Sequence, residues 1–179
     1  HWMVHSFPTR RSSDLPHPAI SGMPHLLKGV ARDSGTLRCQ WLYGDGTSNS
    51  VTTVSDRNKI ESAHTYTGTP GQTFTATLRV WDAADNVGEA TYTVALVEDT
   101  PAAGTDLALD LALWWLHKDQ NKSTGQWTSM YTDWRGVETV GACINAFQKN
   151  GHRLDGNASD NPYVETVRLG YDWLFAKLA

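Results

Sequence analysis

The middle of the chain alternates apolar and polar residues with a period of two. From Thr73 to Trp81 every second residue is apolar, and Ala90 to Val97 repeats the pattern. Such alternation is typical of a β-strand with one face in a core and the other in water. The segment 82–86 between the two runs is rich in Asp and Asn, which favour turns because they bond their own backbone. The pattern predicts a hairpin of two long strands.

Shorter strands are expected upstream of this hairpin. The segment 37–41 has apolar side chains on one face and ends at the glycine-rich turn 44–46. A further strand is expected within 25–32. Because short strands are separated by clusters of Gly, Asn, Asp and Ser, we predict an antiparallel β-sandwich over residues 24–98.

Beyond the hairpin the hydrophobic period changes from two to 3.6, which indicates helices. The polar segment 99–104 contains Pro and Gly and is expected to be a linker. Helices are then expected over 105–118, with Thr105 or Asp106 as the N-cap, and over 136–150. A third should begin at Pro162, with Asn161 as its N-cap.

The first of these helices has an unusually wide apolar surface. One face carries Leu109, Ala112, Leu113 and Leu116, and the adjoining face carries Leu107, Leu111 and Trp114. Because so wide a surface needs cover on more than one side, we expect 105–179 to be a truncated helical domain with an incomplete core.

Composition and charge exclude some partner classes. The chain has 179 residues, 40% of them hydrophobic, and a net charge of -4. Because its 15 Lys and Arg residues are scattered, we expect no nucleic-acid partner. No run approaches the roughly 20 apolar residues that span a bilayer. Cys39 and Cys143 lie in different predicted domains, so free thiols are expected rather than a disulfide.

The first residues show no periodic pattern. The string over 6–15 reads SFPTRRSSDL, and residues 1–15 resemble the translation of a sequencing adapter. Prolines follow at positions 16 and 18. We therefore expect residues 1–23 to be a disordered leader that contributes nothing to the fold.

Three separate motifs in the sandwich segment occur in a characteristic order. They are Trp41 with Gly44, Asp45 and Gly46, then His64 and Tyr66, and then Gly71 with the strand ending at Asp82. This arrangement resembles the PKD domain, an immunoglobulin-like β-sandwich. The resemblance implies a non-catalytic module at the cell surface or outside the cell. It also implies structural roles for these residues, and Tyr66 is placed to bond back to the backbone at a sandwich corner.

Some residues of this segment also have functional interpretations. Asp45, Asp82 and Asp85 could gather at one end of the sandwich and hold calcium through their carboxylates. Turn capping explains each of them as well, so no cofactor is expected and calcium stays the alternative. Trp81 should point outward from its strand, where an aromatic side chain can contact glycan or protein.

The helical segment carries a second resemblance. Gln120, Gly125 and Trp127 are similar to the Gln-Trp repeats of prenyltransferase and terpene-cyclase α/α toroids. In those repeats Gln ties helix ends together and Trp stacks beside it. The acid motif and zinc set of the toroid enzymes are missing, so their chemistry is not implied here.

Together these patterns favour a non-catalytic adhesion or spacer module of a larger secreted or cell-surface bacterial protein. Its expected partners are protein or carbohydrate. The alternative is an accessory domain joined to the first part of a toroid enzyme that acts on a lipid or polysaccharide. We expect no catalytic residue in the chain itself.

Overall fold

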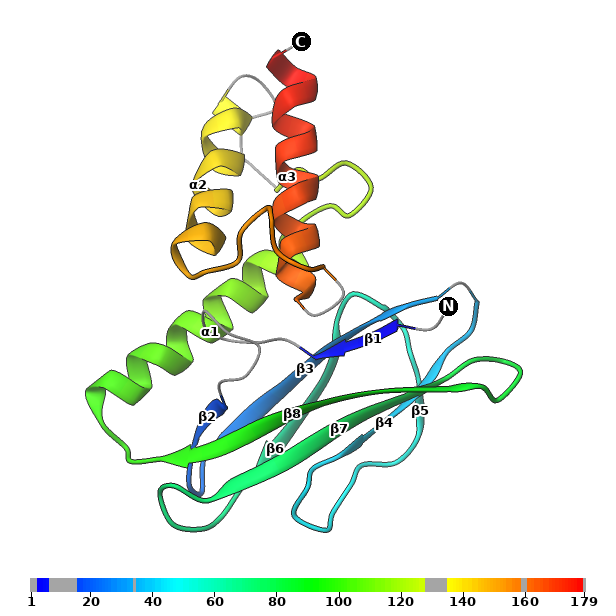
Figure 1. The fold of residues 1–179 in the computed structure, drawn as a ribbon, viewed down its shortest axis with the longest axis vertical. Helices are drawn as coiled ribbons and strands as arrows, with labels where there is room; N and C mark the ends of the chain where they lie inside the picture. The colour runs from blue at the N-terminus through cyan, green and yellow to red at the C-terminus, as the bar shows by residue number, and fades with distance from the viewer. Residues whose placement is uncertain (1–2, 7–15, 34, 128–134, 159–160, 179) are drawn as a thin grey trace.

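The computed structural model describes residues 3–6, 16–33, 35–127, 135–158 and 161–178. In these ranges the chain forms two β-sheets and three α-helices (Figure 1). The strands are β1 (Met3–Ser6), β2 (His17–Ile20), β3 (Pro24–Arg32), β4 (Arg38–Leu42), β5 (Thr52–Thr53), β6 (Ile60–Thr65), β7 (Thr73–Trp81) and β8 (Val87–Val97). The helices are α1 (Pro101–Asp119), α2 (Arg135–Lys149) and α3 (Pro162–Leu178).

The two sheets form the layers of a β-sandwich. One has the order β1-β3-β6 and the other the order β2-β8-β7-β4-β5. The predicted hairpin is confirmed, because β7 pairs antiparallel with β8 from Thr73 opposite Ala95 to Trp81 opposite Val87. The expectation of a wholly antiparallel sandwich is wrong at one place, since β2 runs parallel to β8. After β2 the chain turns and crosses to the other sheet as β3.

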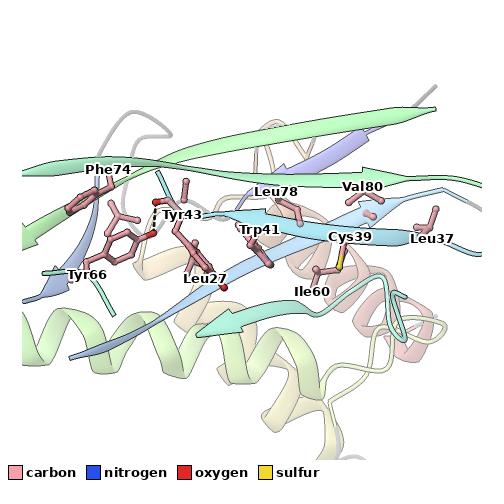
Figure 2. Packing of buried hydrophobic residues seen from close by; sticks show 14 of the residues in the cluster. Leu27, Leu37, Cys39, Trp41, Tyr43, Ile60, Tyr66, Phe74, Leu78 and Val80 are labelled. Atoms are coloured by element: carbon pink, nitrogen blue, oxygen red, sulfur yellow. Dashed lines mark hydrogen bonds between the residues drawn. The ribbon is translucent and has the colours of Figure 1, made fainter. Parts of the chain in front are cut away.

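Side chains from both layers fill the space between the sheets. The cluster contains Leu27, Leu37, Cys39, Trp41, Ile60, Tyr66, Phe74, Ala76, Leu78, Val80, Val94 and Leu96. Figure 2 shows Trp41 between Leu27 and Leu78 in this core. Trp41 is fully buried, and the inward residues of β7 are buried while its outward residues are not. The alternation in the sequence therefore identified the core face correctly.

The expected leader over 1–23 is wrong in two places. Residues 3–6 form β1, which pairs with β3, and residues 17–20 form β2. His17 and Ala19 in β2 are buried. The two prolines at positions 16 and 18 suggested an unstructured segment, yet β2 lies at the end of its sheet, where a residue without an N–H is tolerated. The resemblance of residues 1–15 to an adapter stays a prediction.

Helix α1 begins four residues earlier than expected. Thr100 caps α1 by accepting a hydrogen bond from the Ala103 N–H at 3.2 Å, so the expected linker 99–104 and the cap at Thr105 or Asp106 are wrong. Thr100 is followed by Pro101, a favoured first residue of a helix. The other two helices match their predicted positions within one residue.

A second core joins the helices to the sandwich. It combines Leu113, Trp114, Trp127, Val140, Ile144, Phe147, Tyr163 and Val167 with Val30 of β3. The buried face of α1 carries Asp110, Leu113, Trp114 and His117, so its expected apolar stripe is only partly correct. Figure 1 shows α2 and α3 side by side beyond α1. None of the helices in the described ranges is long and apolar enough to cross a bilayer.

Candidate functional site

The turn after β4 brings residues of the first and second motifs together. One Asp45 carboxylate oxygen accepts hydrogen bonds from the Thr47 N–H at 2.9 Å and the Thr47 hydroxyl at 2.6 Å. The other carboxylate oxygen lies 2.6 Å from His64 Nε2. The His64 ring stacks on Tyr43 with 3.9 Å between ring centroids. Asp45 of the first motif and His64 of the second are thus bonded to each other, a contact that the sequence did not predict.

These bonds change the acidity of Asp45. Slight burial acts to raise its pKa, but hydrogen bonds from Thr47 and His64 outweigh it and lower the pKa to about 2. The carboxylate therefore stays ionised at neutral pH and holds the turn.

Tyr66 holds the corner of the sandwich, as the resemblance implied. Its side chain is fully buried, and its hydroxyl donates to the Tyr43 carbonyl oxygen at 3.0 Å (Figure 2). Burial raises the pKa of Tyr66, followed in importance by the charge of Asp45, so the hydroxyl remains a donor. Gly44 lies beside this corner, where a Cβ would stand 2.3 Å from the Thr75 carbonyl oxygen. The close contact between the turn and β7 requires glycine there.

Removing the Tyr66 hydroxyl should loosen this corner. We expect Tyr66→Phe to lower the free energy of unfolding by about 1–3 kcal/mol, because a buried hydrogen bond to the backbone is lost. Urea-induced unfolding followed by circular dichroism measures the change. Tyr171→Phe is the matched control, because its hydroxyl bonds Gln148 at 3.1 Å in a partly buried position and its loss should cost less. Equal effects would contradict a special role for Tyr66.

The three residues of the alternative calcium interpretation do not come together. Asp45 lies near Thr75 at the start of β7, whereas Asp82 follows the end of the same strand. Asp82 accepts hydrogen bonds from the N–H groups of Ala84 and Asn86 at 2.7 and 2.9 Å, which caps the hairpin turn. Asp85 has a positive φ of 62° and pairs with Arg38. Among the described residues, no group of three or more His, Cys, Asp or Glu side chains could hold a metal ion.

Trp81 lies on the outer face of the five-stranded sheet. It is opposite Arg38 of β4 on one side and Val87 of β8 on the other. Its side chain is half-buried, while Val87 is 52% exposed. The prediction that Trp81 points away from the core is consistent with this position, although its neighbours cover part of the ring.

Gln120, Gly125 and Trp127 come together at the end of α1. The Gln120 side-chain amide donates to the Gly125 carbonyl at 3.0 Å and to the Thr166 carbonyl of α3 at 2.8 Å. The Trp127 ring N–H donates to the Leu116 carbonyl at 2.6 Å. Gly125 has a φ of 81°, and a Cβ there would stand 2.0 Å from the Leu169 carbonyl oxygen. Gln120 thus ties α1 to α3, as its motif implied.

Buried polar side chains join the sandwich to the helices, and this joint was not predicted from the sequence. Lys28 of β3 and Asp110 of α1 form a buried ion pair, with exposed fractions of 2% and 5%. Glu61 of β6 accepts from the Trp114 ring N–H and from Lys118, the latter at 2.7 Å. The one available signal was Asp110, a single acid inside an apolar run.

A second polar cluster lies farther along the same joint. The His117 ring is 3.0 Å from the Asn58 carbonyl and 2.7 Å from the Thr166 hydroxyl. The Lys122 amine lies 3.2 Å from His117 Nδ1, the ring nitrogen that also faces the Thr166 hydroxyl, and burial lowers the pKa of Lys122 to about 7. Arg32 of β3 pairs with Glu165 of α3. These contacts fix the helices on the sandwich.

Comparison with known proteins gives fold-level similarity alone. No family model matches the chain, and no curated protein matches it. The PKD domain of an M14-like peptidase from a Thermoplasmatales archaeon is 15% identical over 46% of this chain and 88% of that chain, with a TM-score of 0.41. A structure of promiscuous carbohydrate-binding modules of the β-sandwich superfamily is 18% identical over 55% of this chain and 36% of that chain, with a TM-score of 0.37.

A conjugative transposon lipoprotein from Bacteroides eggerthii is also similar. It is 15% identical over 52% of this chain and 95% of that chain, with a TM-score of 0.35. None of these three structures is described as an α/α toroid, so the resemblance of the helices to Gln-Trp repeats stays a prediction. At such low scores the similarities do not decide the function, which has to be argued from the residues of this chain.

Proposed function

We propose that this chain is a non-catalytic adhesion and spacer module of a larger secreted or cell-surface protein. It contacts carbohydrate or protein through the outer face of the sheet β2-β8-β7-β4-β5. The observation that carries this proposal is the row formed by Arg38, Trp81 and Val87 across three neighbouring strands. The row combines an aromatic ring, a cation and an exposed aliphatic side chain on one flat surface.

The rest of the same face is polar and accessible. Its exposed side chains include Thr73, Thr75, Glu89 and Thr91. Arg79 and Glu89 pair across the two long strands beside Trp81. A flat surface with one aromatic ring and many hydroxyl groups suits a flat partner, such as the surface of an insoluble polysaccharide or a protein.

A spacer role is supported by the way the helices are held. The ion pair between Lys28 and Asp110 and the bonds of Glu61 to α1 fix α1 on the β1-β3-β6 layer, which leaves the outer face of the other sheet open. Asp45 also has a structural part in this module, because its carboxylate bonds Thr47 and His64 at the turn after β4.

The proposal predicts binding that depends on Trp81. We expect the chain to sediment with particles of cellulose, chitin or peptidoglycan, and Trp81→Ala to weaken that binding by about tenfold, since a stacked aromatic contact contributes on the order of 1–2 kcal/mol. Cosedimentation at increasing particle concentration measures this. Thr65→Ala is the control, because Thr65 is exposed in β6 of the other sheet.

Two results would contradict this account. If Trp81→Ala binds as well as the original chain while both melt at the same temperature, the outer face is not the contact surface. If incubation with any of the polysaccharides releases new reducing ends, the chain is an enzyme and not a binding module.

A further inference from the structure

A groove runs along the joint between α1 and the sandwich, away from the outer sheet face. Two adjoining hollows of about 390 and 230 Å³ share Lys59 and Glu61 as walls. The first continues to Trp115 and Asp119 of α1, and the second reaches the edge strand β5. The larger hollow falls within the roughly 300–1,000 Å³ that is common for ligand sites.

Trp115 is the large aromatic side chain at the helical end of this groove. It is 60% exposed, whereas its neighbour Trp114 is 1% exposed and belongs to the core. An exposed indole ring is costly in water and is the kind of surface on which the apolar face of a sugar ring packs. Leu111 lies one helical turn before it and is also exposed, so the ring has apolar support on one side.

The charges along the groove are compensated within the chain. Lys118 lies 2.7 Å from Glu61, and Lys59 lies 3.4 Å from Asp56. With each lysine already paired to a carboxylate, the groove offers no excess of positive charge to an anionic polymer. Charged side chains fixed in this way still present hydrogen-bonding groups to the hydroxyls of a neutral ligand.

Hydroxyl side chains line the other end. Thr53 and Ser55 are exposed in and just after β5, the last strand of its sheet. The thiol of Cys39 closes the hollow from the core side and contacts the Thr52 hydroxyl at 3.6 Å. The groove therefore passes from an aromatic platform over paired charges to a hydroxyl-bearing strand edge.

From this arrangement we propose that the groove binds a single chain of a neutral oligosaccharide, with Trp115 as the stacking platform. The proposal rests on the proposed carbohydrate-contacting function and deepens it. The groove is bounded by α1 on one side and by β5 and β6 on the other and would take one soluble chain, whereas the outer face with Trp81 would take a surface.

Soluble ligands separate the two sites. Isothermal titration of the whole chain uses cellohexaose, xylohexaose, mannohexaose and chitohexaose as neutral probes and oligogalacturonate as an acidic probe. We expect at least one neutral hexasaccharide to bind and the acidic probe to bind at least tenfold more weakly. Trp115→Ala should weaken binding of the neutral probe at least tenfold, and Trp115→Phe by less than threefold, because the phenyl ring keeps the platform.

Trp81→Ala is the matched control for this experiment. It should leave hexasaccharide binding unchanged, because Trp81 lies on the outer face of the β2-β8-β7-β4-β5 sheet and lines neither hollow. Loss of hexasaccharide binding in Trp81→Ala but not in Trp115→Ala would overturn the groove and leave the proposed function standing. Because Trp115 is exposed, its variants should melt like the original chain, which checks that any loss is local.

Three further outcomes would also overturn the groove proposal. They are binding of none of the neutral hexasaccharides, preference for oligogalacturonate, and a dimer in sedimentation velocity that Trp115→Ala dissociates. In the last case the exposed Trp115 and Leu111 would be an interface between two copies of the chain. Cosedimentation with insoluble particles remains a separate test of the function proposed for Trp81.

Discussion

The free energy of unfolding should fall by several kcal/mol as the pH decreases from 6.5 to 4. Burial is the main cause that lowers the pKa of His25 to about 4, with Lys28 and then His64 adding to it. Burial likewise lowers the pKa of His152 to about 4, against a hydrogen bond with Asn161. Both side chains therefore stay mostly neutral in the folded chain down to about pH 5 and begin to take up protons only near pH 4.

The direction of this change in stability depends on whether the folded or the unfolded chain binds protons at the higher pH. In the unfolded chain these histidines have pKa values near 6.5, so the unfolded state gains protons as the pH falls below that value. Each histidine should then destabilise the fold by about 3 kcal/mol, fully expressed near pH 4. Burial lowers the pKa values of His17 and His117 in the same direction.

Urea unfolding at pH 7.5, 6.0, 5.0 and 4.5 measures this loss. The double variant His25→Gln and His152→Gln should show a clearly smaller decrease, while its difference from the original chain stays constant between pH 7 and 8. An unchanged slope in the double variant would show that other groups cause the acid sensitivity.

Replacing Lys28 by Met should destabilise the chain by about 3–5 kcal/mol, because it leaves Asp110 buried without its partner charge. Burial raises the pKa of Asp110 and lowers that of Lys28, and the attraction between the two opposes both shifts. The ion pair therefore determines where α1 packs on the sandwich more than it adds to the free energy of unfolding.

The double variant Lys28→Met and Asp110→Leu tests this distinction. It should recover most of the lost stability, since two apolar side chains of similar size replace the pair. Lys118→Met is the matched control, because its pair with Glu61 is partly exposed and should contribute less than about 1 kcal/mol. A double variant as unstable as Lys28→Met alone would contradict the argument.

Local patterns in the sequence predicted local structure well. The β7–β8 hairpin, the corner hydrogen bond of Tyr66 and the cap of α3 by Asn161 all depend on residues close in sequence or on a characteristic motif. Asn161 accepts from the Tyr163 N–H at 3.1 Å, as an N-cap residue should.

Features that depend on long-range packing were missed. The sequence of β2 contains two prolines and has no clear alternation, and its place depends on pairing with β8 far along the chain. The calcium hypothesis grouped Asp45 with Asp82, although one strand of nine residues separates their two turns. From the sequence alone, Trp115 could not be distinguished from the other apolar residues of α1. The burial of Asp110, Leu113 and His117 shows which face of this helix is covered.

Strand β3 is built into both cores, with Leu27 facing the sandwich and Val30 facing the helices. A bending motion between the two parts would have to open a hydrophobic core and separate Lys28 from Asp110 at the same time. Under tension the sandwich and the helices should therefore move as one rigid body, and not as two units joined by a flexible linker. The distance that the chain spans would be set by the length of this rigid body. The helices would keep a constant orientation relative to the outer face of the sheet.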